Sequence, residues 1–289
     1  MSIWFVPRDA AARSMGADAV AAALTDRGET VVRNGSRGML WMEPLIERAE
    51  TRDGERVGWS NMTAVQIEQA LPSEDSEHYV GPVEEIDYLA RQNRWIYERV
   101  GVTDPLDPED YLRHGGLAGL KNALAVSGDA VVDIITTSGL RGRGGAGFPA
   151  GIKWRTVAEQ SAQPHAGESR DATPHKYICV NADEGDSGTF ADRMLMEGDP
   201  FCLLEGMTIA AHAVGADRGL VYLRSEYPDA IATLQAAIHI ARERHWLGDD
   251  ILGSKVAFDV EIRVGAGSYV CGEETAMLES LEGRRGMVR

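Results

Sequence analysis

The chain has 289 residues, of which 44% are hydrophobic and 26% charged, a globular composition with room for one large or two modest domains. Its formal net charge of -16 would repel the phosphate backbone of a nucleic acid, so neither DNA nor RNA is expected as a partner. The sequence shows no apolar run long enough to span a bilayer and no signal peptide. Its 3 cysteines lack CxxC spacing, which fits a protein of the reducing cytoplasm.

A small α+β module is predicted at residues 1–75. We expect short strands at 2–6, 29–33 and 38–42, a helix at 17–24, a hairpin made of 44–53 and 56–60, and a closing helix at 64–71. This order is typical of a thioredoxin-like module. Modules of this type often carry a [2Fe–2S] cluster, but no cysteine precedes Cys179, so the thiolate ligands are missing. We interpret the module as a docking domain, with a plain structural cap as an equal alternative.

The next segment, residues 76–125, is predicted to be a helical linker region with a helix at 84–100 and a second short helix ending near 125. From 126 to 289 strands alternate with helices, which predicts a Rossmann-like α/β domain with a parallel sheet and helices on both faces. We expect its strands at 177–180, 219–223 and 258–264. Ligands bind such sheets at the carboxyl ends of the strands, so the loops after these strands are the candidate site.

A glycine-rich stretch, Leu140 to Trp154 (LRGRGGAGFPAGIKW), is the centre of the predicted site. Glycine permits positive φ and close approach to a ligand, and successive N–H groups can form a nest for phosphate oxygens. Arg143 and Lys153 add positive charge there. A flexible surface loop is the alternative, which the interleaved apolar residues such as Phe148 make less favourable. The glycines in question are Gly142, Gly144, Gly145, Gly147 and Gly151.

A second candidate loop, Asn181 to Gly188 (NADEGDSG), follows the strand expected at 177–180. Its carboxylates, on Asp183, Glu184 and Asp186, could accept hydrogen bonds from ribose hydroxyls and repel a 2′-phosphate, which favours NAD over NADP. The alternative is an acidic turn that caps the helix expected to begin near Thr189.

A third candidate turn, VGAGSYVCG at 264–272, again follows a strand and leads into a helix. Gly272 permits close approach to a ligand, and Glu273 and Glu274 lie in the first helical turn, where acidic residues also simply match the helix dipole. Cys271 is expected to be a small packing residue. The 7 histidines make no metal-binding pattern, so no metal site is predicted.

Taken together, GLRGRGGAGFPAGIKW, VNADEGDSGTF and GAGSYVCGEETAMLESLEGRRG resemble the flavin-bearing, NADH-oxidising subunit of respiratory complex I, NAD-reducing hydrogenases and NAD-dependent formate dehydrogenases. The resemblance runs from about Asp104 to the C-terminus. The NADEGDSG loop and the cysteine-free N-terminal module are most similar to the formate dehydrogenase beta subunit. A diaphorase subunit of a hydrogenase or of complex I is the alternative, and a non-catalytic assembly module is an alternative of another class.

The resemblance implies FMN and NAD as cofactors, with hydride transfer between nicotinamide and flavin and no catalytic protein residue. It also implies iron–sulfur subunits and a molybdenum- or tungsten-type formate dehydrogenase catalytic subunit as partners. Relatives continue with a β-rich domain and a domain that holds a four-cysteine [4Fe–4S] cluster, for which this chain has no ligands. The implied flavin positions are Gly142, Arg143, Gly144, Lys153, Asn181, Asp183, Tyr269, Gly272 and Glu273. Gly145, Gly147 and Glu184 are further candidate cofactor-binding residues in the same loops. The implied nucleotide positions are Phe148, Asp186 and Glu274.

Overall fold

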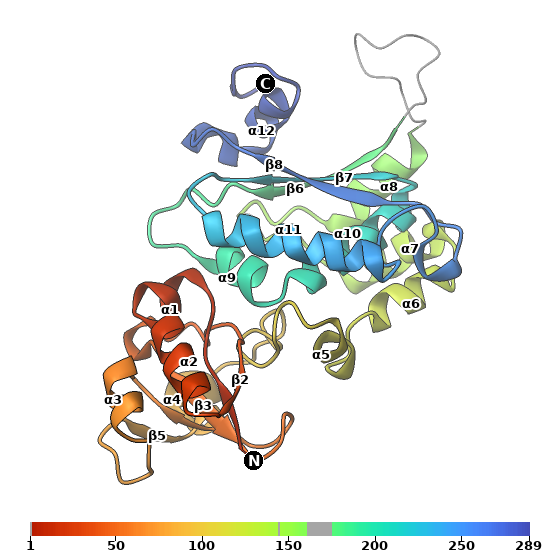
Figure 1. Ribbon diagram of the computed structural model, residues 1–289. Helices are drawn as coiled ribbons and strands as arrows, with labels where there is room; N and C mark the ends of the chain where they lie inside the picture. Colours follow the sequence, from red (N-terminus) through yellow and green to blue (C-terminus); the bar gives the residue numbers. More distant parts are fainter. Residues whose placement is uncertain (1, 144, 161–174) are drawn as a thin grey trace. The chain divides into compact units, whose positions relative to one another are not determined.

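A computed structural model describes residues 2–143, 145–160 and 175–289 (Figure 1). They form two compact units, Met1–His114 with Phe190–Pro200, and Gly115–Thr189 with Phe201–Arg289. The boundary after His114 lies inside the predicted linker region of 76–125, and the predicted domain limits stay predictions. No helix among the described residues combines the length and the apolar character that crossing a membrane requires.

The first unit is built on a five-stranded sheet with the order β2-β1-β3-β4-β5. Strand β1 pairs parallel to β2 and antiparallel to β3, and β3 and β4 form the expected hairpin. A βαβ unit and a hairpin therefore share one sheet, which is the predicted thioredoxin-like arrangement. The elements are β1 (Ile3–Phe5), α1 (Ala10–Ser14), α2 (Ala17–Asp26), β2 (Thr30–Val32), η1 (Leu40–Met42), β3 (Ile46–Ala49), β4 (Val57–Trp59), α3 (Ala64–Gln69), β5 (Tyr79–Pro82), η2 (Val83–Glu85), α4 (Asp87–Ala90), α5 (Pro108–Arg113) and α9 (Ala191–Gly198).

The core of this unit lies between the sheet and helix α2. Val20 and Leu24, one turn apart on α2, are buried with Trp4 and Trp59, whose ring centroids are 5.4 Å apart. Burying such side chains contributes about 1.5–3 kcal/mol each, so this apolar cluster holds the sheet and helix together.

Two sequence predictions in this unit are wrong. Residues 38–42 do not form a strand, because Gly38 adopts a left-handed φ of 81° and 40–42 wind into the 3-10 helix η1. Residues 84–100 do not form one helix, and only the end of η2 and the short helix α4 are helical there. Leu89 is buried, whereas Tyr88 and Ile96 are exposed, so no continuous apolar stripe stabilises a longer helix.

The second unit contains a parallel sheet with the order β6-β7-β8, as predicted. The carboxyl ends of the three strands are in register, because Ala182 pairs with Leu223 and Leu223 with Val264. The loops that follow the strands therefore leave from one edge of the sheet. The elements are α6 (Ala118–Leu124), α7 (Gly128–Ser138), α8 (Ala150–Glu159), β6 (Tyr177–Ala182), α10 (Pro200–Val214), β7 (Arg218–Leu223), α11 (Pro228–Glu243), η3 (Ile251–Gly253), β8 (Asp259–Val264), η4 (Tyr269–Gly272) and α12 (Glu274–Leu281).

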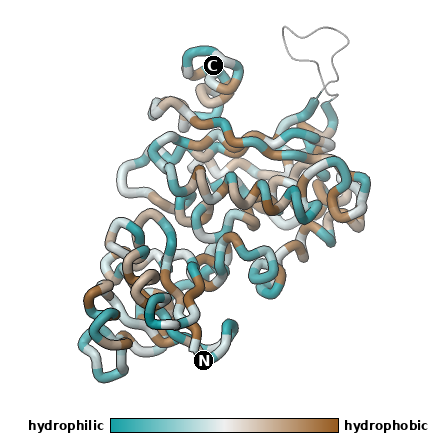
Figure 2. The backbone as a smooth tube through the Cα atoms, in the orientation of Figure 1, coloured by the Kyte–Doolittle hydropathy of each residue, from teal (hydrophilic) through white to brown (hydrophobic). Residues whose placement is uncertain are grey.

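Helices cover both faces of this sheet. Helices α10 and α11 lie along one face (Figure 1), and hydrophobic residues alternate with hydrophilic ones along α11 (Figure 2). Leu234 and Ile238 belong to its buried side. On the other face α12 packs through Met277 against Tyr222 and Cys271, and the Tyr222 hydroxyl lies 2.9 Å from Ser280 Oγ. The buried position of Cys271 agrees with its predicted packing role.

Candidate functional site

Two of the predicted loops are joined at the carboxyl edge of the parallel sheet. Asn181, at the end of β6, donates from Nδ2 to the carbonyl of Gly272 over 2.8 Å. Its Oδ1 accepts from the backbone N–H of Asp183 at 3.2 Å. A Cβ atom on Gly272 would lie 3.1 Å from the Asp183 carbonyl oxygen, so the two turns are in close backbone contact. One amide side chain thus connects the acidic loop to the third turn.

Tyr269 closes a second contact between the same two loops. Its hydroxyl donates to Asp186 Oδ1 over 3.1 Å, and the Asp186 carboxylate raises the pKa of Tyr269. Its ring lies so near Gly185 that a Cβ there would be 2.7 Å from Cδ2 of the ring. The side chain is nevertheless 71% exposed, so its aromatic surface is available to a ligand.

The glycine-rich stretch forms a closed loop in front of helix α8. The N–H of Gly142 donates to the Phe148 carbonyl at 2.9 Å, and the N–H of Ala150 donates to the Leu140 carbonyl at 2.8 Å. Between them, two glycines adopt positive φ, 100° at Gly145 and 61° at Gly147. Gly144 lies outside the described residues. The loop leads directly into the N-terminus of α8, where free N–H groups and the helix dipole favour an anion.

Lys153 connects this loop and helix to the third turn. Its Nζ lies 3.2 Å from Glu274 Oε2 in an exposed ion pair. Among the described residues no hydrogen bond or ion pair joins Arg143 or Phe148 to the other two turns. The three predicted stretches therefore do converge, the first through Lys153 and the other two through Asn181 and Tyr269.

Glu273 has a structural role that the sequence left open. One of its oxygens, Oε2, accepts from the N–H groups of Thr275 and Ala276 at 3.0 and 2.9 Å, so it caps α12. These bonds, with one from the Thr275 hydroxyl as the largest cause, lower the pKa of Glu273. Glu273 thus lies at the N-cap of α12 and not in its first turn, and its contact with flavin stays a prediction.

Sequence reasoning missed two residues after β7. Arg224 donates from Nη1 to the Glu184 carbonyl, and the Tyr227 hydroxyl donates to Glu184 Oε2 at 3.1 Å. The Arg224 guanidinium also lies over the Tyr227 ring, 4.8 Å from its centroid. Both residues follow the strand predicted at 219–223, so applying the strand-end rule to that strand too would have found them.

The site fits an anionic ligand with an aromatic ring. Arg143 and Lys153 lie beside a glycine loop at a helix N-terminus, which suits a phosphate. Phe148 and Tyr269 expose aromatic surface. In addition, Arg224 has a buried Nε without a hydrogen-bond partner among the described residues, so a donor is left over at this edge.

Residues 135–289, more than half of the chain, match the family model described as the Nuo51 FMN-binding domain. The chain belongs to the Nuo51 FMN-binding domain family. The predicted resemblance and the predicted flavin cofactor class are thereby confirmed. The match covers the whole glycine loop, the acidic loop and the third turn.

Named relatives of this Nuo51-family chain include components of two enzymes. It is 46% identical over 196 residues to the NADP-reducing hydrogenase subunit HndC of Solidesulfovibrio fructosivorans, covering 68% of this chain and 38% of that protein. It is 48% identical over 195 residues to an NADH-quinone oxidoreductase subunit of Rhizobium meliloti, covering 67% of this chain and 44% of that protein. The chain thus spans less than half the length of these relatives.

A solved structure resembles this Nuo51-family chain over its full length. The crystal structure of an NAD+-reducing [NiFe]-hydrogenase in the H2-reduced state matches with a TM-score of 0.51 and 30% sequence identity. The match covers 100% of this chain and 47% of the other. The likeness therefore includes residues 1–114 of the first unit, which lie outside the residues matched by the family model.

Proposed function

We propose that this chain forms the FMN- and NAD(H)-binding part of a diaphorase-type oxidoreductase subunit. The observation that carries the proposal is the convergence of three turns at one edge of the parallel sheet in a chain of an FMN-binding family. FMN, when bound, accepts a hydride from a nicotinamide and passes electrons on one at a time. The protein then has to hold, orient and tune its two ligands, and no nucleophilic side chain is required.

Each turn has a distinct proposed task. The glycine loop, with Gly142, Gly144, Gly145 and Gly147, would present N–H groups to the FMN phosphate, and Arg143 and Lys153 would balance its charge. Asn181 and Gly272 would hold the acidic loop and the third turn at a fixed spacing beneath the ring. Phe148 and Tyr269 would supply aromatic surface for the nucleotide.

The acidic loop is proposed to select NAD over NADP. Asp183, Glu184 and Asp186 would repel a 2′-phosphate, and their oxygens could accept from a ribose hydroxyl. Burial raises the pKa of the Asp183 carboxyl, with Arg224 acting against this effect. The relative HndC is named as NADP-reducing, so the family contains both preferences and the loop has to be tested directly.

The finer proposal is an NAD-dependent formate dehydrogenase complex in the cytoplasm, with iron–sulfur subunits and a molybdenum- or tungsten-type catalytic subunit as partners. It rests on the NADEGDSG loop and on an N-terminal module without cysteines. The second candidate is the diaphorase subunit of an NAD-reducing hydrogenase, which is favoured by the full-length structural match. Purification of the native complex, followed by assays for formate and hydrogen oxidation, separates the two.

The core of the proposal is tested with the purified chain. We expect it to bind FMN, seen as quenching of flavin fluorescence, and then to catalyse NADH-dependent reduction of ferricyanide. A chain that binds neither FMN nor NADH under these conditions would instead be the non-catalytic assembly module considered as the alternative.

A further inference from the structure

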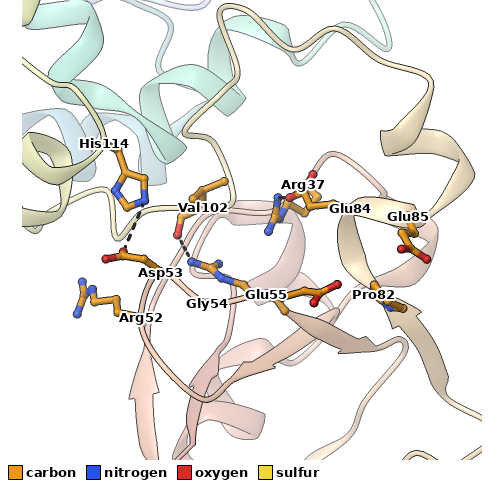
Figure 3. Close-up of a pocket in the computed structure, with 11 residues that line it drawn as sticks. Arg37, Arg52, Asp53, Gly54, Glu55, Pro82, Glu84, Glu85, Val102 and His114 are labelled. Carbon is orange, nitrogen blue, oxygen red and sulfur yellow. Dashed lines mark hydrogen bonds and ion pairs between the residues drawn. The ribbon is translucent and has the colours of Figure 1, made fainter.

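A cavity of about 290 Å³ lies in the first unit (Figure 3), and none of its lining residues belongs to the proposed flavin site. Most of the lining residues are polar or charged, among them Arg37, Arg52, Asp53 and His114. Asp53 belongs to the turn between β3 and β4, and His114 follows the last residue of α5. Tertiary structure therefore brings together residues that are far apart in the sequence.

Three potential metal ligands come together here, two of which, Asp53 and His114, line the cavity. Asp53, Asp110 and His114 each offer one ligand atom, and these atoms lie within 4.8 Å of one another. Asp110 and His114 are four residues apart, which places them on the same side of the helical turn. Asp110 is 1% exposed, whereas Asp53 is exposed, so the cluster has a buried and a solvent side.

The hydrogen bond of His114 leaves one ring nitrogen facing a carboxylate. Nδ1 lies 2.9 Å from the carbonyl oxygen of Asp110, which can only accept, so Nδ1 carries a hydrogen. The other nitrogen, Nε2, lies 3.8 Å from Asp53 Oδ1, as the dashed line in Figure 3 marks. Nε2 is therefore the nitrogen that can bind either a proton or a metal ion beside Asp53. A histidine whose second nitrogen donates to a carbonyl is the arrangement typical of a metal ligand.

The separation also suits a metal ion better than a hydrogen bond. At 3.8 Å, Nε2 and Oδ1 are too far apart for a direct hydrogen bond. Two ligands that each lie about 2.1 Å from a tetrahedral ion are about 3.4 Å apart, so a shift of a few tenths of an ångström would bring this pair to ligand spacing.

The surrounding charges permit a cation. Arg52 lies 2.9 Å from Asp110 Oδ2, and Arg113 lies 2.6 Å from Oδ1 of the same carboxylate. Asp104 and Asp107 also face Arg52, so three aspartates, counting Asp110, balance the charge of this arginine. Each carboxylate oxygen has two lone pairs, which leaves Asp110 Oδ1 able to bind an ion beside Arg113. The buried Nε of Arg52 has no partner among the described residues, so it could donate to a water on the ion.

We propose that Asp53, Asp110 and His114 bind a divalent transition-metal ion such as Zn²⁺, with its fourth position open toward the cavity. The imidazole nitrogen decides the class of ion, because Ca²⁺ and Mg²⁺ prefer oxygen ligands alone. This site is independent of FMN binding, since all three ligands belong to the first unit.

The test is a zinc competition titration of the chelator-treated full chain against a chromophoric chelator. We expect one Zn²⁺ per chain, with affinity lowered more than about tenfold by Asp53→Asn and by His114→Gln. Asp53→Asn is the decisive variant, because this exposed turn residue is not needed for folding of the core. His239→Gln is the matched control, since His239 pairs with Glu243 at 3.3 Å on an exposed helix face. The zinc affinity of this variant should equal that of the wild type.

Three results would overturn the site. One is the absence of zinc binding in the wild-type chain, and another is equal affinity in the Asp53→Asn and His239→Gln variants. The third is a thiolate-to-metal absorption band when Co²⁺ is used as a spectroscopic probe, because this band would show that Cys179, Cys202 or Cys271 binds the ion. A chain that binds no zinc could still bind inorganic phosphate in this cavity. If Arg52→Gln abolished that phosphate binding, the cavity would be assigned to an anion.

Discussion

The ring of Tyr269 lies against Gly185, where a Cβ atom would be only 2.7 Å from the ring. The contact joins the third turn to the acidic loop, and the hydroxyl of the same tyrosine donates to Asp186. Because both loops leave the sheet at the same edge, any shift of the ring changes the space offered to a ligand there. Gly185 is therefore a packing requirement of the proposed site.

Gly185→Ala should displace Tyr269 and weaken both FMN binding and NADH-dependent ferricyanide reduction. Overpacking of this kind costs about 1–3 kcal/mol, so we expect a loss of roughly tenfold or more in flavin affinity. Flavin fluorescence titration measures it. Gly206→Ala is the control, since nothing lies within 4 Å of a Cβ at this helical glycine. Equal affinities for the two variants would show that the contact has no bearing on the ligand.

Lys153→Ala should reduce FMN retention without loss of fold stability. A charge-assisted hydrogen bond to phosphate contributes about 1.5–3 kcal/mol, which corresponds to a loss of roughly 10- to 100-fold in affinity. The exposed pair with Glu274 contributes at most about 1 kcal/mol to folding. Lys121→Ala, on the exposed side of α6, serves as the matched charge removal. If both variants retain FMN like the wild type, Lys153 does not hold the phosphate.

Asp186→Ser should relax the discrimination against NADPH, because it removes a negative charge from the loop proposed to face the ribose. The ratio of kcat/KM for NADH and NADPH is the measurement. Tyr269→Phe provides the control, since it removes the hydrogen bond to Asp186 but leaves its charge in place. A ratio that stays at the wild-type value in Asp186→Ser would show that selectivity comes from another residue.

Glu43 should make folding stability depend on pH. Burial, reinforced by the charges of Asp9 and Glu47, raises the pKa of Glu43 to about 8. The N–H of Leu45, which donates to Glu43 Oε2 at 3.0 Å, has the opposite effect and lowers this pKa. A pKa raised in the folded state means that the protonated form stabilises the fold. The contribution is fully present below the unfolded pKa of about 4.3 and is lost as the pH rises toward 8.

Replacing the carboxyl by an amide tests this dependence. Urea unfolding at pH 6 and pH 8 should show wild-type stability falling by up to about 1.4 kcal/mol per pH unit relative to Glu43→Gln. The exposed Glu68→Gln should follow the wild type. Parallel curves for the wild type and Glu43→Gln would contradict a buried, protonated Glu43.

Local pattern was enough for the second unit and its loops. Strands β6 and β7 are short and mostly apolar, β8 alternates charged and apolar residues, and long helices separate them, so a parallel sheet is the simple solution. Glycine-rich or acidic turns after two of these strands, and a third before α8, then indicated the site. Each of these signals lies within its own segment of about fifteen residues, so each can be recognised without knowledge of the rest of the chain.

Tertiary contacts decided the rest. The segment 84–100 has helical spacing, but only part of its apolar side, including Leu89, is buried, while Tyr88 and Ile96 are exposed, and most of the segment is not helical. Arg224 and Tyr227 reach Glu184 only because β6 and β7 pair in register. Asp53 and His114 face one cavity although they are far apart in the sequence. Sequence alone indicated which turns could approach a phosphate or a dinucleotide, since glycine content and charge are local properties, and the resemblance of these turns to a flavoprotein family added FMN. Which side chains meet across those turns, and around the cavity, depends on packing between distant segments, which only the folded structure specifies.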